Sequence, residues 1–218
     1  MKKTPNLKIG LIGASGRLGK EIAALHTPHA CFTRTSPAYP DPQIDLYIDV
    51  SDNKALSNNI DVALKAKKPL VIGTTGHTDF SIITEAACQI PIFYTPNFSL
   101  GLALMKKVSR ELAKKFHKEA QIDLIEMHHK HKKDAPSGSA LLLAKIVEEN
   151  HPSPVNIHPI RSGEIVGRHT LFFNTAEENI TVSHEAYNRT AFAKGAVAAA
   201  FFLASKPPGL YGMDELLD

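Results

Sequence analysis

The sequence has few cysteines, no long apolar run and only a small excess of charge. Its two cysteines, Cys31 and Cys88, are too far apart to indicate a disulfide framework or a Cys-x-x-Cys metal site, and we expect both to be buried apolar side chains. The longest apolar stretch, residues 196–204, is well short of the ~18 residues that a membrane-spanning helix needs. The formal net charge of +3 is too small to indicate a nucleic-acid partner.

The N-terminal residues also lack the apolar segment of a secretory signal peptide. Met1 is followed by two lysines, but Lys8, three glycines and Arg17 interrupt any apolar stretch after them. We therefore expect a cytoplasmic protein with neither a membrane nor a nucleic-acid partner. The 218 residues are enough for one or two domains, and the sequence has no internal repeat or low-complexity segment.

Short apolar strands alternate with helices in the first part of the chain. Such alternation predicts an α/β fold with a Rossmann-like, doubly wound parallel sheet, in which ligands bind at the carboxyl ends of the strands. Glycine-bearing or polar segments follow three of these strands, at 13–19, 73–76 and 95–98. The expected strands are 7–12, 30–34, 44–50, 69–72 and 91–94, and the expected helices are 20–26, 52–67 and 82–88.

The segment Gly13-Ala-Ser-Gly16-Arg-Leu-Gly19 lies between the first strand and the first helix. In this context a Gly-x-x-Gly-x-x-Gly pattern predicts a dinucleotide site. Gly13 permits a tight turn, Gly16 permits close approach of a pyrophosphate, and Gly19 permits close packing of helix on strand. The alternative is an ordinary strand–helix turn that needs glycine only for its backbone geometry.

The pattern changes after residue 97. Leu104, Val108, Leu112 and Phe116 recur every four residues and predict one apolar helix face. Strands at 122–127, 155–161, 169–174 and 179–186, with helices at 140–149 and 191–205, predict a second, α+β domain. We expect residues 1–97 to form a dinucleotide-binding domain, 98–205 to form a substrate-binding and tetramerisation domain, and 206–218 to pack back onto the first.

Residues 126–139 read Glu-Met-His-His-Lys-His-Lys-Lys-Asp-Ala-Pro-Ser-Gly-Ser and carry the strongest chemical signal. Three histidines and three lysines fall within 128–133, and the Pro-Ser-Gly-Ser turn opens onto an apolar helix. The free N–H groups and the dipole at a helix N-terminus favour a bound anion. The segment therefore predicts a small substrate with several carboxylates, handled by groups that can also move protons.

A zinc site is the competing hypothesis for this segment. Its ligands would be His128, His129, His131 and Asp134. We disfavour it and expect no metal, because adjacent histidines on an extended strand point apart and no His-Glu-x-x-His or cysteine pattern accompanies them. If the strand persists, His131 points away from its immediate neighbours and is structural. Lys130 and Lys133 are expected to be solvated.

The chain resembles the 4-hydroxy-tetrahydrodipicolinate reductase family, formerly called dihydrodipicolinate reductase, over nearly its whole length. The resemblance implies hydride transfer from NADH or NADPH to a cyclic dicarboxylate that loses water, in diaminopimelate and lysine biosynthesis. It also implies a homotetramer of two-domain subunits. The matching segments, in order, are 13–19, 73–76, 97–101, 126–140, 161–169, 192–196 and 209–213.

The resemblance also implies roles for individual residues. His128 matches the catalytic histidine and Lys132 the proton donor, and the substrate-binding positions are His129, Lys132, Gly138 and Ser139. The chemistry agrees, because hydride addition leaves an electron-rich atom that a lysine can protonate, and two carboxylates need cations and N–H donors. The expected cofactor-binding residues are Gly13, Ala14, Ser15, Gly16, Arg17, Leu18, Arg34, Gly73, Thr74, Thr75, Thr95, Pro96, Asn97 and Phe98.

The chain departs from the family where the adenosine ribose would bind. The segment between the first helix and residue 49 is shorter than usual, and Thr33-Arg34 stands where the family often has an acid followed by an arginine. An arginine with neighbouring hydroxyls favours the 2′-phosphate of NADPH, so we expect NADPH to be preferred over NADH. Arg17 is either a second cation for this phosphate or a solvated side chain. Thr95-Pro96 also replaces the small residues usual at that place.

Two other functions are alternatives to the predicted reductase. A non-catalytic NAD(P)-binding regulatory protein on the same fold predicts damaged catalytic positions, whereas His128 and Lys132 are intact. A semialdehyde dehydrogenase needs a nucleophilic cysteine, and Cys88 lies in a helix without that setting. Two residues stay open. Arg161 either reaches a carboxylate or pairs with Glu164, and His169 either belongs to the site or packs at a strand end.

Overall fold

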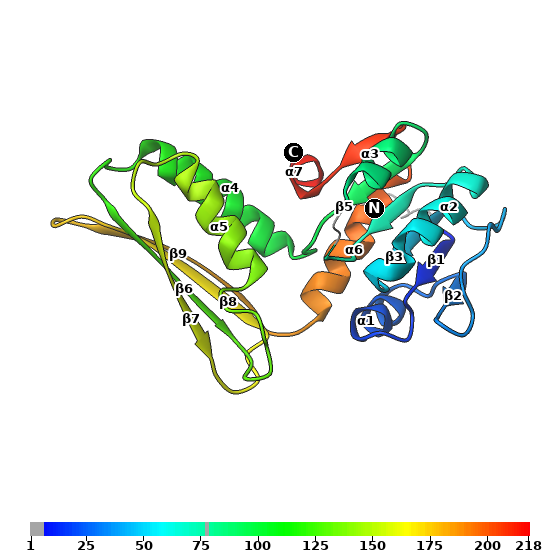
Figure 1. Ribbon diagram of the computed structural model, residues 1–218, viewed down its shortest axis with the longest axis horizontal. Coiled ribbons are helices and arrows are strands. Elements are labelled where there is room, and N and C mark those ends of the chain that lie inside the picture. The colour runs from blue at the N-terminus through cyan, green and yellow to red at the C-terminus, as the bar shows by residue number, and fades with distance from the viewer. Residues whose placement is uncertain (1–6, 77–78) are drawn as a thin grey trace, which may run out of the picture. The chain divides into compact units, whose positions relative to one another are not determined.

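The computed structural model describes residues 7–76 and 79–218 and divides the chain into two compact units (Figure 1). The first unit runs to Phe98 and resumes with Thr190–Asp218, and the second is Ser99–Arg189. The helix α6 (Thr190–Leu203), which the sequence predicts in the second domain, lies in the first unit instead. It belongs there because its small and apolar residues pack on α1 (Arg17–Leu25) and on the strands of the first unit.

A six-stranded parallel sheet forms the centre of the first unit. The strands run in the order β10-β5-β4-β3-β1-β2, and every neighbouring pair is parallel. The inner strands β1, β3 and β4 are buried along their whole length, which explains their apolar sequences. The fold class predicted from the sequence is therefore confirmed. The strands are β1 (Ile9–Ile12), β2 (Ala30–Phe32), β3 (Leu46–Asp49), β4 (Leu70–Ile72), β5 (Pro91–Tyr94) and β10 (Gly209–Tyr211).

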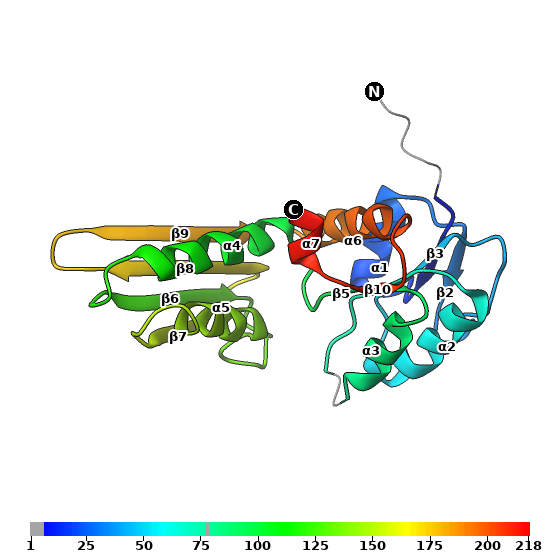
Figure 2. The ribbon, with the colours of Figure 1, turned by 90° about the horizontal axis from the view of Figure 1, so that it is seen from above.

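Helices cover both faces of this sheet (Figure 2). α1 and α6 pack against each other on one face, while α2 (Leu56–Ala66) and α3 (Ser81–Ala87) pack together on the other. A short 3-10 helix, η1 (Asn53–Ala55), precedes α2, and α7 (Met213–Leu217) follows β10. Among the described residues, no helix has both the length and the apolar character needed to cross a bilayer.

The segment after β2 differs from the sequence-based expectation. The strand ends at Phe32 because the backbones of Thr33 and Ser36 pair with each other and form a turn, which places Arg34 in a loop. The prediction of buried cysteines is wrong for both residues. Cys31 is exposed because β2 is an edge strand, and Cys88 is exposed just beyond the end of α3.

The second unit is a four-stranded mixed sheet in the order β7-β6-β8-β9. β6 and β7 are parallel, and the other two pairs are antiparallel. Two helices, α4 (Leu100–Lys115) and α5 (Gly138–Glu148), lie side by side on one face (Figure 1). The strands are β6 (Gln121–His128), β7 (Val155–Arg161), β8 (Gly167–Asn174) and β9 (Asn179–Ala186).

Only the second half of the face predicted for α4 packs on the core, where Leu112 and Phe116 are partly buried. Leu104 and Val108 are 50% and 48% exposed, whereas Leu102, Met105 and Ala113 are buried against the sheet and α5. The cause is geometric: a strict four-residue spacing drifts around a helix of 3.6 residues per turn. The apolar stripe that begins at Leu104 therefore points to solvent at that end of the helix.

Candidate functional site

The turn between β1 and α1 needs glycine for its geometry. Gly13 has a φ of +87°, and a β-carbon there would lie 2.8 Å from the backbone of Val50 and Ser51. A β-carbon at Gly19 would overlap the carbonyl oxygen of Gly13. Because glycine has no β-carbon, the turn can lie close to the end of β3 and α1 can start close to the turn, as in nucleotide-binding strand–helix turns. The intervening residues Ser15, Gly16 and Arg17 are exposed, while Ala14 and Leu18 are half-buried.

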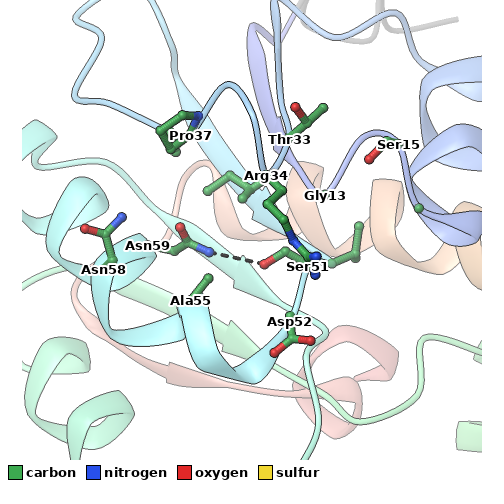
Figure 3. Close-up of a pocket in the computed structure, with 14 residues that line it drawn as sticks. Gly13, Ser15, Thr33, Arg34, Pro37, Ser51, Asp52, Ala55, Asn58 and Asn59 are labelled. Atoms are coloured by element: carbon green, nitrogen blue, oxygen red, sulfur yellow. Dashed lines mark hydrogen bonds between the residues drawn. The ribbon is translucent and has the colours of Figure 1, made fainter.

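A cavity of about 630 Å³ lies beside this turn (Figure 3). Of the predicted cofactor residues, Gly13, Ser15, Gly16 and Arg34 line it. In Figure 3 the Arg34 side chain extends from the loop after β2 in the direction of Ser51. The volume of the cavity is within the range of small-molecule and cofactor pockets. The lining residues that the sequence did not point to are Ile12, Thr33, Pro37, Ala38, Val50, Ser51, Asp52, Ala55, Asn58 and Asn59.

A buried carboxylate anchors the wall of this cavity. Asp49, at the end of β3, is fully buried, and it accepts hydrogen bonds from the Ser51 amide at 2.9 Å and from the Asn59 amide group at 2.8 Å. The Ser51 hydroxyl donates to the same carboxylate at 2.6 Å, and Asn59 also donates to that hydroxyl (Figure 3). The network ties the loop after β3 to α2, and no local sequence pattern reveals it.

The other predicted cofactor residues lie at the ends of β4 and β5. Thr74, Thr95 and Phe98 are buried, whereas Thr75 and Pro96 are exposed. The Thr95 hydroxyl donates to the Asn97 carbonyl at 2.8 Å. A β-carbon at Gly73 would overlap the Phe98 ring, and one at Gly195 on α6 would overlap the Phe98 carbonyl oxygen. Glycine at 73 and 195 thus lets this segment pack closely against the sheet and α6.

A buried ionic network lies next to the substrate-binding positions predicted in the second unit. The Glu126 carboxylate is fully buried and accepts four hydrogen bonds. His128 Nδ1 donates at 2.5 Å, the Ser137 amide donates at 3.0 Å, and the Arg161 guanidinium donates twice, at 2.7 and 3.0 Å. Arg161 therefore pairs with Glu126 rather than with Glu164, which settles the alternative left open by the sequence.

Burial lowers the pKa of two histidines at this network, His128 and His169. Burial acts to raise the pKa of Glu126, but hydrogen bonds from Arg161, His128 and Ser137 outweigh it and leave that pKa lowered. Burial lowers the pKa of His128, although Glu126 opposes this effect. His169 on β8 is 3% exposed, and burial together with the nearby His128 lowers its pKa to about 4.

Lys132 lies in the loop between this network and α5. Its ammonium group is 2.8 Å from the Asp134 carboxylate, and this contact is the main cause that lowers the pKa of Asp134. The same carboxylate accepts the backbone N–H of Gly138 at the start of α5. The Ser137 hydroxyl caps the helix by accepting the Ala140 amide at 3.2 Å. An internal carboxylate thus joins a lysine to a helix N-terminus.

The strand ends earlier than the interpretation of His131 requires. β6 stops at His128, and the amide of Lys132 donates to the carbonyl of His129 in a turn. The alternation of side chains expected for His131 on a continued strand is therefore absent, and the rings of His129 and His131 lie 6.3 Å apart in this turn. His129 Nδ1 is buried and has no hydrogen-bond partner among the described groups. Lys130 is exposed, with Glu164 3.8 Å away.

Three residues of this site received no assigned role from the sequence: Glu126, Arg161 and His169. Glu126 carried a usable signal, since strand alternation puts it on the same face as His128. Arg161 is paired with His128 in the β6–β7 register, and the register of a distant strand cannot be read from the sequence. His169 Nε2 lies 3.3 Å from the Ser137 hydroxyl, which places its ring in the site.

Three side chains of the network, those of Glu126, His128 and His169, are also spaced like metal ligands. Atoms of Glu126, His128 and His169 lie within 4.8 Å of one another, which differs from the ligand set considered from the sequence. A cation fits poorly there, because both Glu126 oxygens already bind the Arg161 guanidinium and an ion would face that positive charge. The arrangement suits a hydrogen-bonded acid–base network.

The chain is similar to known proteins over its whole length. Residues 26–98 match the N-terminal model of the dihydrodipicolinate reductase family, and residues 101–217 match its C-terminal model. The 4-hydroxy-tetrahydrodipicolinate reductase of Zymomonas mobilis is 34% identical over 100% of this chain and 99% of the relative. The enzyme of the same name from Akkermansia muciniphila is 36% identical over 97% of this chain and 98% of the relative.

A solved structure shares the fold. It is a dihydrodipicolinate reductase with bound dipicolinate from Paenisporosarcina sp. TG-14, with a TM-score of 0.79 and 22% sequence identity over 96% of this chain and 98% of that one. The full-length relatives also cover the glycine turn at 13–19, which precedes the residues matched by the N-terminal model. The chain therefore belongs to the dihydrodipicolinate reductase family and is an NAD(P)H-dependent oxidoreductase.

Proposed function

We propose that the chain reduces 4-hydroxy-tetrahydrodipicolinate to tetrahydrodipicolinate, with loss of water, in diaminopimelate and lysine biosynthesis. The observation that carries this proposal is the second unit's cluster, in which Lys132 and the α5 N-terminus already hold a carboxylate, that of Asp134. A carboxylate of the substrate would find the same two kinds of partner. Residues 101–217, which include this cluster, match the family.

The residues take these roles in the reaction. His129, Lys132 and the amides of Gly138 and Ser139 bind the carboxylates of the substrate. The reduced nicotinamide supplies the hydride, and the electron-rich atom that results must be protonated. Lys132 delivers that proton as a general acid. His128, neutral and hydrogen-bonded through Nδ1, keeps Nε2 for contact with the substrate.

For the cofactor, we propose that the glycine turn and the cavity beside it bind the adenosine diphosphate half of NAD(P)H. The exposed start of α1 provides N–H donors for the pyrophosphate. Arg34 and Thr33 line the cavity, and no acidic residue occurs in 31–36, which favours NADPH. Asp52 also lines the cavity, but its carboxylate accepts the Lys54 amide and caps η1. Gly73–Thr75 and Thr95–Phe98 would bind the rest of the cofactor.

The assembly we propose is a homotetramer built on the open face of the second unit's sheet. Within the described residues of that unit, no helix covers the face opposite α4 and α5. Ile125, Met127 and Phe172 point to that face, because their strand neighbours are buried under the helices. This face also carries the hydrogen-bonded pair of Asp123 and His158, so it is a mixed surface on which three apolar side chains favour burial against another subunit.

The proposed function is tested by a coupled assay. The substrate is generated freshly in the cuvette, and oxidation of NADPH or NADH is followed by the absorbance of the reduced nicotinamide. Substrate-dependent oxidation supports the proposal. Its absence with both cofactors, in a protein shown to be folded by circular dichroism, would favour a non-catalytic nucleotide-binding protein instead.

A further inference from the structure

We propose that Glu126 is a positioning residue that fixes the orientation and the tautomer of His128, with Arg161 as its counter-ion. The inference rests on the proposed function, in which His128 contacts the substrate. Glu126 itself is fully buried, so it acts through the histidine.

The backbone of β6 sets the geometry of this pair. Glu126 and His128 are two residues apart on one strand, so their side chains emerge on the same buried face. His128 Nδ1 lies 2.5 Å from one carboxylate oxygen. Because an ionised carboxylate can only accept, Nδ1 must carry the proton. The neutral imidazole therefore presents an unprotonated Nε2.

Arg161 makes a buried carboxylate possible at this place. It lies opposite His128 in the parallel register of β6 and β7, and it donates to both oxygens of Glu126. An isolated charge buried in a protein would instead be neutralised by a shifted pKa. Beside a neutral, protonated Glu126, His128 would no longer prefer the Nδ1–H tautomer. Arg161 therefore keeps Glu126 ionised and able to accept the Nδ1 proton.

The surroundings of His128 leave its Nε2 atom available for proton transfer. A β-carbon at Gly167, on the adjacent strand β8, would lie 3.1 Å from Nε2, so glycine keeps that side open. The charged or titratable groups that face the ring are Glu126 on β6, Arg161 on β7, His169 on β8 and Lys132 in the following loop. Glu126 is the only anion in this set.

The same ion pair also holds the loop that carries Lys132. Glu126 accepts the Ser137 amide at 3.0 Å, and Arg161 donates to the Asp134 carbonyl at 2.6 Å. Both ends of the 134–137 segment are thereby fixed to one carboxylate–guanidinium pair. A change at Glu126 should therefore impair turnover through His128 and the Lys132 loop together, with little effect on nucleotide binding in the other unit.

The first test is Glu126→Gln, which keeps the size of the side chain and removes its charge. We expect kcat to fall on the order of 10²-fold or more, since misplaced proton-transfer groups cost 10²–10⁴-fold, while KM for the nucleotide stays within about threefold. Glu164→Gln is the matched control, because Glu164 is an exposed acid at the neighbouring turn. It should keep kcat near that of the unchanged protein.

Nitrogen-15 NMR of the labelled histidine side chain separates positioning from a structural role. In the unchanged protein, neutral His128 should show a protonated Nδ1, and Glu126→Gln should shift the population toward a protonated Nε2. The His128 signal is identified by its loss in His128→Ala. This readout needs no substrate, so it decides the Glu126 contact even if the proposed reaction is not observed.

A double variant guards against simple loss of fold. Glu126→Gln leaves the half-buried Arg161 without its counter-ion, so the melting temperature should fall. Glu126→Gln with Arg161→Met removes both charges and should recover part of that stability, while kcat stays low. Near-normal kcat in either folded variant, or an unchanged Nδ1–H tautomer in Glu126→Gln, would overturn the inference.

Discussion

At the scale of single residues, Asp134 holds both of the groups that we expect a substrate carboxylate to need. Its carboxylate contacts the Lys132 ammonium and the Gly138 amide. In the proposed mechanism, a substrate carboxylate therefore has to displace Asp134 from Lys132 before the lysine can bind or protonate the substrate. The ion pair holds the Lys132 ammonium group near the start of α5.

The role of Lys132 gives the first prediction. Lys132→Ala should lower kcat by roughly 10²–10⁴-fold, because it removes the proposed general acid. Lys133→Ala is the control, since Lys133 is an exposed neighbour in the same loop and should leave kcat nearly unchanged. Steady-state kinetics with saturating nucleotide measures both. If Lys132→Ala turns over at the rate of the control, another group donates the proton.

Arg34 gives the second prediction, on the choice of cofactor. A charge-assisted contact to the 2′-phosphate contributes about 1.5–3 kcal/mol, which corresponds to roughly 10–100-fold in affinity. We expect kcat/KM to be higher for NADPH than for NADH, and Arg34→Ala to erode that ratio mainly through KM for NADPH. Lys20→Ala, at an exposed cation on α1 outside the cavity lining, should leave the ratio unchanged. Equal use of both nucleotides by the unchanged protein contradicts the assignment.

His169 gives the third prediction, on stability. Its pKa is about 4 in the folded protein and near 6.5 when unfolded, so the unfolded state binds more protons between these values. Stability should therefore fall as the pH drops from about 6.5 to about 4, with a loss of roughly 3 kcal/mol from this group. His169→Gln should flatten that part of the profile. Urea unfolding across this range measures it, and an equal slope in the variant would assign the loss to other groups.

At the scale of elements, the sequence predicted what local patterns encode. The βα alternation, the glycine turn and the 126–139 segment were all recognisable because each depends on residues close together in the chain. The position of Arg161 beside Glu126 depends on strand register, and the place of α6 depends on packing against α1. The first half of the face of α4 was mistaken because a four-residue apolar repeat continues past the surface that the sheet covers.

The orientation of α4 gives the fourth prediction. Leu102 is 4% exposed and belongs to the core, whereas Leu104, two residues away, is 50% exposed. Leu102→Ala should therefore cost about 2–5 kcal/mol of unfolding free energy, as buried leucines do. Leu104→Ala should cost less than about 1 kcal/mol. Chemical denaturation measures the pair, and the opposite ranking would restore the helix face predicted from the sequence.

At the scale of the whole molecule, the open sheet face gives the fifth prediction. We expect a tetramer in solution, and Phe172→Asp should dissociate it because a charge would be buried in the proposed interface. Leu104→Asp, at an equally apolar but exposed site on α4, should leave the tetramer intact. Light scattering at micromolar concentration gives the masses. A monomer in the unchanged protein, or a tetramer in Phe172→Asp, would contradict this interface.

The division of the chain has a consequence for the order in which the protein is made. The second unit is inserted into the first, which is interrupted after Phe98 and resumes at Thr190. During synthesis, residues 99–189 leave the ribosome as one contiguous stretch and can fold first. The first unit cannot complete its fold until α6 covers its sheet and β10 pairs with β5. The unit that begins first on the ribosome therefore finishes last, and its uncovered sheet is the part that a nascent chain most needs to protect.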